Sequence, residues 1–306
     1  MSTFLLAQRA IIPTAPTTRR LAAIALGIAA MLTLAACANR PEAPIITPLA
    51  GPVSAQTTSR LNELLPAEVL LLGEQHDAAQ HQQIEQWVIA SLAARGMLAA
   101  VALEMADAGL STATLHPSSS EEQTRMALRW NEPGWPWAAY GPAVMTAVRA
   151  GVPVIGANLP RAEIRTSTLD ARLDTQLPGP ALKAQQQLIR QGHCNLLPES
   201  QIAPMTRSQI AKDIRMADTV SQAVVPGKVV VLLTGSGHAN RALGVPQHLP
   251  AGVIVKSVLL QAGPAGDKQT QNAAEFDAVW TTAALPETDY CAGLREQLAP
   301  KAAPGG

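Results

Sequence analysis

The sequence has few aromatic residues: its 306 positions include five Trp, two Tyr and two Phe. A buried core must therefore be built mainly from aliphatic side chains. An excess of charge of one sign is also lacking, because 23 basic residues balance 23 acidic residues. The sequence shows no basic stripe, which argues against a nucleic acid as a partner.

Several catalytic signatures are absent as well. Thr234 stands where a nucleophile elbow around Ser236 would need glycine, and Gly235-x-Gly237 lacks the third glycine of a dinucleotide-binding turn. The sequence contains neither an H-E-x-x-H motif nor a C-x-x-C-H motif. These absences exclude an α/β-hydrolase elbow, a zincin helix and covalently attached c-type haem.

The first 36 residues have the composition of a bacterial lipoprotein signal peptide. A leader with three arginines precedes the uncharged apolar run Leu21–Ala36, which is short for a membrane-spanning helix of about 20 residues. The run ends in small residues followed by Cys37, so we expect cleavage before Cys37 and acylation of its thiol with palmitate-type chains. The alternatives are an uncleaved anchor helix, or an ordinary signal peptide followed by an incidental cysteine. Ala38, where an Asp would indicate inner-membrane retention, favours the periplasmic face of the outer membrane.

Residues 37–58 carry four prolines among small and polar residues, a composition typical of an extended tether between a lipid and a folded domain. We expect one domain over residues 59–300, in which strand and helix patterns alternate. Continuous apolar strands alternating with helices predict an α/β fold, a mostly parallel central sheet with helices on both faces. Strands are expected at 69–72, 98–103, 152–157, 229–234, 253–260 and 276–281, and helices at 84–92, 119–130, 141–150, 181–190 and 206–224.

Two cysteines remain if Cys37 is lipidated, namely Cys194 and Cys291. An even number of cysteines in an oxidising compartment favours one disulfide between them. The alternative is two separately buried thiols. Neither residue lies in a C-x-x-C context, so a bridge would be structural.

Polar side chains follow four of the expected strands. In open parallel sheets, ligands bind beyond the carboxyl ends of the strands, so these side chains are expected to share one rim. Each residue also has a structural explanation, such as an ion pair between Glu104 and Arg161, or a hydrogen-bonded His238 near a helix start. Independent structural needs would not place all of them on one edge, and we therefore favour a functional cleft. The residues expected at this rim are Glu74, His76, Glu104, Asn158, Arg161 and His238.

These strand-end segments resemble the ChaN-like haem-binding lipoproteins of the Tiki/erythromycin-esterase superfamily. The matching segments are 71–77 (Leu-Leu-Gly-Glu-Gln-His-Asp), 102–105 (Ala-Leu-Glu-Met), 157–161 (Ala-Asn-Leu-Pro-Arg) and 235–239 (Gly-Ser-Gly-His-Ala). The resemblance covers roughly residues 60–292. It implies an α/β fold, haem binding, a role in iron uptake and a homodimer that encloses paired haems.

The first functional hypothesis is a periplasmic haem binder without enzymatic activity. Haem needs apolar walls and an axial ligand such as His or Tyr. Trp135 and Trp137 would line such a site, and Tyr140 or a rim histidine would ligate the iron. The candidate haem-binding residues are His76, Glu104, Tyr140, Asn158, Arg161 and His238.

The second hypothesis is a metal-dependent hydrolase or protease, the activity that the resemblance implies for the Tiki branch. Glu74, His76, Glu104 and His238 would then be the catalytic residues and the ligands of Zn, Mn or Fe. The metal would activate a water molecule, and a glutamate that is not a ligand would act as base. The sequence does not decide between these hypotheses, and a structural envelope lipoprotein is a third reading.

Overall fold

The computed structural model describes residues 53–263 and 275–298. The expected signal peptide, the lipidation site Cys37 and most of the expected tether lie outside these residues. The last part of that tether is helical, because α1 begins at Val53. Within the described ranges, no helix has the length and apolar character needed to cross a membrane.

The domain is built around a six-stranded sheet with the strand order β3-β2-β4-β1-β5-β6. Every neighbouring pair of strands is parallel. Helices lie on both faces, so the predicted fold class is confirmed. The strands are β1 (Val69–Glu74), β2 (Leu98–Asp107), β3 (Val154–Asn158), β4 (Val229–Gly235), β5 (Val255–Ala262) and β6 (Ala278–Thr282).

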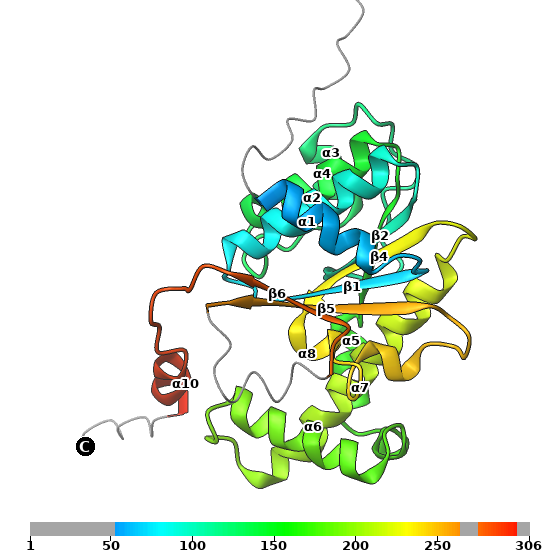
Figure 1. The fold of residues 1–306 in the computed structure, drawn as a ribbon. Coiled ribbons are helices and arrows are strands. Elements are labelled where there is room, and N and C mark those ends of the chain that lie inside the picture. The colour runs from blue at the N-terminus through cyan, green and yellow to red at the C-terminus, as the bar shows by residue number, and fades with distance from the viewer. Residues whose placement is uncertain (1–52, 264–274, 299–306) are drawn as a thin grey trace, which may run out of the picture. The chain divides into compact units, whose positions relative to one another are not determined.

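Two groups of helices cover the sheet. Helices α1 to α4 lie on one face, and α5 to α8 lie on the other (Figure 1). Short 3-10 segments, η1 (Ala171–Thr175) and η2 (Val245–His248), belong to the second group's connections. The helices are α1 (Val53–Glu63), α2 (Ala79–Ala94), α3 (Glu121–Ala127), α4 (Trp137–Arg149), α5 (Arg161–Ser167), α6 (Gly179–Gly192), α7 (Glu199–Gln222), α8 (Ser236–Ala239) and α10 (Cys291–Leu298).

The central strands are buried on both faces. In β1, Leu70 and Leu72 pack with α1, α2 and α4, whereas Val69 and Leu71 pack with α7 and α8. Successive side chains of a strand point to opposite faces, so burial of both faces requires an uninterrupted apolar run. This requirement explains why the strand sequences show no alternation of polar and apolar residues.

Gly73 allows α8 to approach the end of β1. A Cβ atom at Gly73 would lie 2.7 Å from Cβ of Ala239 and 3.0 Å from Cα of Ser236. A larger residue would displace α8, the short helix that carries His238. The glycine therefore helps to set the position of a residue at the strand ends.

All five expected helices begin at a different residue from the predicted one, including α2 at Ala79 and α6 at Gly179. Helix α3 begins at Glu121, two residues after the expected position 119, and its capping box is formed by Ser120 and Gln123. Helix α4 begins at Trp137, directly after Pro136, so Trp137 does not belong to the preceding loop. Helix α7 begins seven residues before the expected position 206, at Glu199, and continues through an internal proline.

The C-terminal part of the domain is fastened by a disulfide. It joins Cys194, after α6, to Cys291, the first residue of α10, with the two Cα atoms 5.9 Å apart. Cys194 and Cys291 are the two cysteines that the sequence predicts to form a disulfide, because they remain after the expected lipidation of Cys37. The bridge links segments 97 residues apart and holds Tyr290, the residue before Cys291, near the carboxyl ends of the strands.

Candidate functional site

The carboxyl ends of three neighbouring strands, β1, β4 and β2, form the centre of the site. The register pairs Glu74 of β1 with Gly235 of β4, and pairs residues 103 and 233 of β2 and β4, so that Glu104 lies beside Thr234. The structure brings together Glu74, His76, Glu104 and His238, all of which line one cavity. Their placement agrees with the strand-end pattern, and their roles stay predictions.

Glu74 is a buried carboxylate that organises one half of the site. Its Oε1 atom lies 2.8 Å from Nδ1 of His76 and accepts a 2.7 Å hydrogen bond from the Tyr140 hydroxyl. The Gln82 amide donates to Oε2. Glu74 is 1% exposed, so these contacts replace the water that a carboxylate would otherwise need.

Glu85 is a second buried carboxyl group beside Glu74. Burial, together with the negative charge of Glu74, holds the pKa of Glu85 well above its usual range. Neither carboxyl oxygen of Glu85 has a hydrogen-bond partner among the described residues, and burial therefore favours the neutral form of this group.

The His76 ring is partly open to solvent, with 41% of its side chain exposed. Burial by itself would lower the pKa of His76, but the hydrogen bond to Glu74 and the charges of Glu104 and Glu74 outweigh it, so the pKa is raised. Trp135 contacts the ring edge to face, with centroids 4.8 Å apart. These contacts fix the orientation of the imidazole.

The Nε2 atom of His76 faces the space above Gly235. A Cβ atom at Gly235 would lie 3.0 Å from this nitrogen and 3.6 Å from Oε2 of Glu104. Within the described part of the chain, the hydrogen bonds of the ring run through Nδ1. Nε2 is therefore the ring nitrogen of His76 that has no hydrogen bond to the described residues.

Glu104 and His238 form the other half of the site. Oε2 of Glu104 accepts 2.8 Å hydrogen bonds from the Thr234 hydroxyl and from the backbone N–H of Gly235. Oε1 lies 3.4 Å from Nε2 of His238. Burial would raise the pKa of Glu104, but the positive charge of His238 and these hydrogen bonds hold it far below its usual range.

Asp213 of α7 contacts the ring nitrogen of His238 that faces away from Glu104. Its Oδ1 atom lies 2.5 Å from Nδ1 of His238. Burial would lower the pKa of His238, but the two flanking carboxylates raise it to about 10. Burial raises the pKa of Asp213 to about 6 against the opposing effect of His238. Both ring nitrogens of His238 are therefore engaged by carboxylates, and the imidazole is charged at neutral pH.

The cavity at these strand ends has a volume of about 930 Å³. Its polar side is formed by Glu74, His76, Glu104 and His238, together with Gln75, Asp77, Gln209 and Lys212. Its apolar side comes from α6, β5 and the segment before β6. These apolar residues are Leu188, Leu259, Leu260 and Phe276.

Three of the predicted site residues do not line the cavity. Tyr140 is 1% exposed and donates to Glu74, and burial and that charge raise its pKa far above the usual range, so it stays protonated. Asn158 donates to the backbone carbonyl of Glu104 and accepts from the N–H of Leu159, so it braces the strand ends. Arg161 is an exposed residue at the start of α5.

Trp137, predicted to line the site with Trp135, is also buried away from it. It is 7% exposed, and its indole N–H donates to Glu121. Trp135 alone of these two residues contacts His76. Neither tryptophan is among the residues that line the cavity, and Trp135 reaches the site only through its contact with His76.

Sequence reasoning missed the partners supplied by helices. Asp213 carries a readable signal, because it lies on the buried stripe of α7 that includes Ile210 and Met216. A charged residue in an apolar stripe indicates a buried ionic partner. Glu85 lies in the same way on the buried face of α2. Tyr290, which donates to Asp77 at the cavity rim, carries no such signal.

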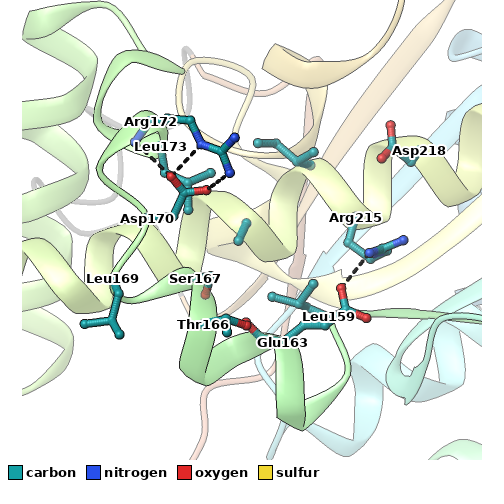
Figure 2. A pocket seen from close by; sticks show the side chains of 12 residues that line it. Leu159, Glu163, Thr166, Ser167, Leu169, Asp170, Arg172, Leu173, Arg215 and Asp218 are labelled. Carbon is teal, nitrogen blue, oxygen red and sulfur yellow. Dashed lines mark hydrogen bonds and ion pairs between the residues drawn. The ribbon is translucent and has the colours of Figure 1, made fainter.

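A second hollow, of about 510 Å³, lies between α5 and α7. Figure 2 shows that four of its charged residues form two ion pairs, Asp170 with Arg172 and Glu163 with Arg215, whereas Asp218 is drawn without such a contact. No histidine, cysteine or tyrosine is among the described residues that line it. It therefore offers no imidazole, thiol or phenol side chain, and the candidate site is the cavity at the strand ends.

A preformed metal centre is not evident. Among residues 53–263 and 275–298, no group of three or more His, Cys, Asp or Glu side chains is arranged to hold a metal ion. The predicted set of Glu74, His76, Glu104 and His238 is divided into two hydrogen-bonded halves. Its role as a metal site stays a prediction.

Comparison with known proteins by sequence and by structure leads to the same family, ChaN. The family model for haem-binding uptake, Tiki superfamily, ChaN, matches residues 60–249. The chain is similar to the solved structure of cofacial heme binding to ChaN of Campylobacter jejuni, with 27% identity, a TM-score of 0.57, and coverage of 69% of this chain and 88% of that chain. The structure of the type III effector HopBA1 matches at 17% identity with a TM-score of 0.36, covering 75% of this chain and 90% of the other. No match was found among the curated proteins.

Proposed function

Since the chain belongs to the haem-binding uptake family ChaN of the Tiki superfamily, we propose that it binds haem in the cavity at the carboxyl ends of β1, β2 and β4. Haem binding and uptake as a kind of function follow from the family and from the similarity to ChaN of Campylobacter jejuni. The cavity as the binding site, and His76 as the iron ligand, are our proposal.

The residues of the cavity fit haem in size and in chemistry. The volume of about 930 Å³ lies within the range of about 300–1,000 Å³ that is common for ligand sites. The apolar side of the cavity suits the macrocycle, and an imidazole at the polar side suits the iron. Haem, when bound, supplies an iron centre that takes a neutral imidazole nitrogen as an axial ligand.

One observation supports His76 over the other candidates. A histidine that ligates a metal usually donates its second ring N–H to a carboxylate, which orients the ring and makes the ligating nitrogen more basic. His76 has this arrangement, because Glu74 binds Nδ1 and Nε2 faces the cavity. His238 lacks it, because both of its nitrogens are held by carboxylates.

Titration of the haem-free, unlipidated protein with haem tests the proposal. We expect a saturable Soret band, which the His76→Ala variant should lose and the His116→Ala variant should keep, since His116 is exposed and lies outside the cavity. No Soret band in the wild-type protein would contradict the proposal. Bound divalent metal, with hydrolysis that is lost in both His76→Ala and His238→Ala, would support the metal-dependent hydrolase instead.

We also propose that the protein is a lipoprotein on the periplasmic face of the outer membrane. The support is the leader sequence and the position of Cys37. Cells grown with labelled palmitate should incorporate the label into the wild-type protein and not into the Cys37→Ser variant. Label in both proteins would contradict lipidation at Cys37.

A homodimer that encloses paired haems is a further part of the proposal. Its support is the similarity to the ChaN structure with cofacial haem binding. Sedimentation of the haem-loaded protein should then show twice the mass of one chain. A monomer at saturating haem would contradict this part while leaving haem binding by one chain intact.

A further inference from the structure

Among the described residues that line the cavity, each charged side chain except one has an ion-pair or hydrogen-bond partner in the protein. His76 is paired with Glu74, and the charge of His238 is shared with Glu104 and Asp213. Asp77 accepts a hydrogen bond from the hydroxyl of Tyr290. Each of these groups therefore meets its partner within the protein, and none needs an ion from a ligand.

Lys212 is the exception. It lines the cavity from α7 and is half-buried, yet no ion pair or hydrogen bond joins its ammonium group to any residue of the described ranges. The charge of Lys212 acts on the adjacent Asp213, but the two side chains form no ion pair, because Oδ1 of Asp213 is bound to His238 and Oδ2 is without a hydrogen bond among the described residues. The ammonium nitrogen is not one of the buried polar atoms without a partner, so in the cavity it is accessible to an anionic group of a ligand.

The cavity thus presents an unpaired cation on the same lining as an apolar wall of Leu259, Leu260 and Phe276. A ligand that satisfies both features is largely apolar and carries a carboxylate. Resting on the proposed function, we propose that Lys212 binds a propionate carboxylate of haem and thereby selects porphyrins with a free acid group. The Lys212 contact would orient the macrocycle, while His76 would hold the iron.

Binding of haem and of haem dimethyl ester, compared in two lysine variants, tests this inference. Lys212→Met should weaken haem binding by about tenfold, the lower end of what one charge-assisted hydrogen bond contributes. The same variant should bind the dimethyl ester as the wild type does, because the ester has no charge to lose. Lys212→Arg should retain most of the affinity for haem.

Lys228→Met is the matched control, because Lys228 is exposed and does not line the cavity. It should bind both porphyrins as the wild type does. Equal losses for haem and its ester in Lys212→Met, or no loss for either, would overturn the assignment of Lys212. Failure of the wild type to bind haem at all would instead overturn the proposed function, so the two failures are distinguishable.

Discussion

Oε1 of Glu74 lies 2.8 Å from Nδ1 of His76, and the two residues are separated by a single position at the end of β1. The carboxylate is buried and the imidazole is partly open. At the end of β1, the buried Glu74 carboxylate therefore holds the Nδ1 edge of the His76 ring. The Nε2 edge of the ring is on the opposite side. This relationship connects the fold to the proposed haem site.

The role of Glu74 predicts the effect of Glu74→Gln. The amide keeps the shape of the side chain but removes the charge that raises the pKa of His76. We expect the pKa of His76, measured by NMR in the haem-free protein, to fall, and haem affinity to fall by about 10-fold or more. Glu63→Gln on the exposed face of α1 should change neither, and an unchanged haem affinity in Glu74→Gln would contradict the role of Glu74.

The open space at Nε2 of His76 predicts the effect of Gly235→Ala. The added methyl group would lie 3.0 Å from that nitrogen, so it would occupy the approach of a ligand. We expect haem binding to weaken roughly tenfold, within the 1–3 kcal/mol that such overpacking costs. Gly179→Ala places its methyl group in open space outside the cavity and should have little effect. Equal affinities of the two variants would argue against His76 as the ligand.

His238 predicts a loss of stability at alkaline pH in the haem-free protein. Its pKa is raised to about 10 in the folded state from the ordinary value of 6.5, so its contribution is complete below pH 6.5 and is lost as the pH rises through about 10. Asp213, with a pKa of about 6, has already ionised when this window begins.

Urea unfolding at pH 6.5 and pH 10 measures this contribution. The free energy of unfolding should fall by more than about 1 kcal/mol further in the wild type than in His238→Gln, which cannot titrate there. Parallel declines in the two proteins would show that His238 is not stabilised by its carboxylate partners.

The disulfide between Cys194 and Cys291 is expected to stabilise the protein because it restricts the unfolded chain. Cys194→Ser opens a bridge that spans 97 residues, and it should lower the free energy of unfolding by roughly 2–4 kcal/mol. The wild type unfolded in reductant should reach the same value, whereas reductant should not change the variant. A variant as stable as the oxidised wild type would show that the bridge does not constrain the chain.

The strands and the strand-end residues were predictable because each depends on local sequence. An apolar run such as residues 69–72 must be a strand buried on both faces, and the polar residues after it must lie at the rim of a parallel sheet. Glu74, His76, Glu104 and His238 could therefore be placed without coordinates. The start of α3 shows the limit of this reasoning, because Ser119 and Ser120 both fit the capping-box pattern and only Ser120 is used.

The partners of the site residues could not be placed, because they depend on how helices dock on the sheet. Tyr140 reaches Glu74 from α4, and Asp213 reaches His238 from α7, over 66 and 25 positions of the chain. Nothing in the neighbouring sequence of Tyr140 distinguishes a buried hydroxyl donor from an iron ligand. The sequence therefore identifies the rim, and the helix packing decides which residues face the cavity.

A crystal structure of the haem complex tests the central claim most directly. The account predicts iron bonded to Nε2 of His76, with the macrocycle against Leu259 and Leu260 and Glu74 still bound to Nδ1. Haem held by other residues, for example in the hollow between α5 and α7, with His76 free, would contradict it.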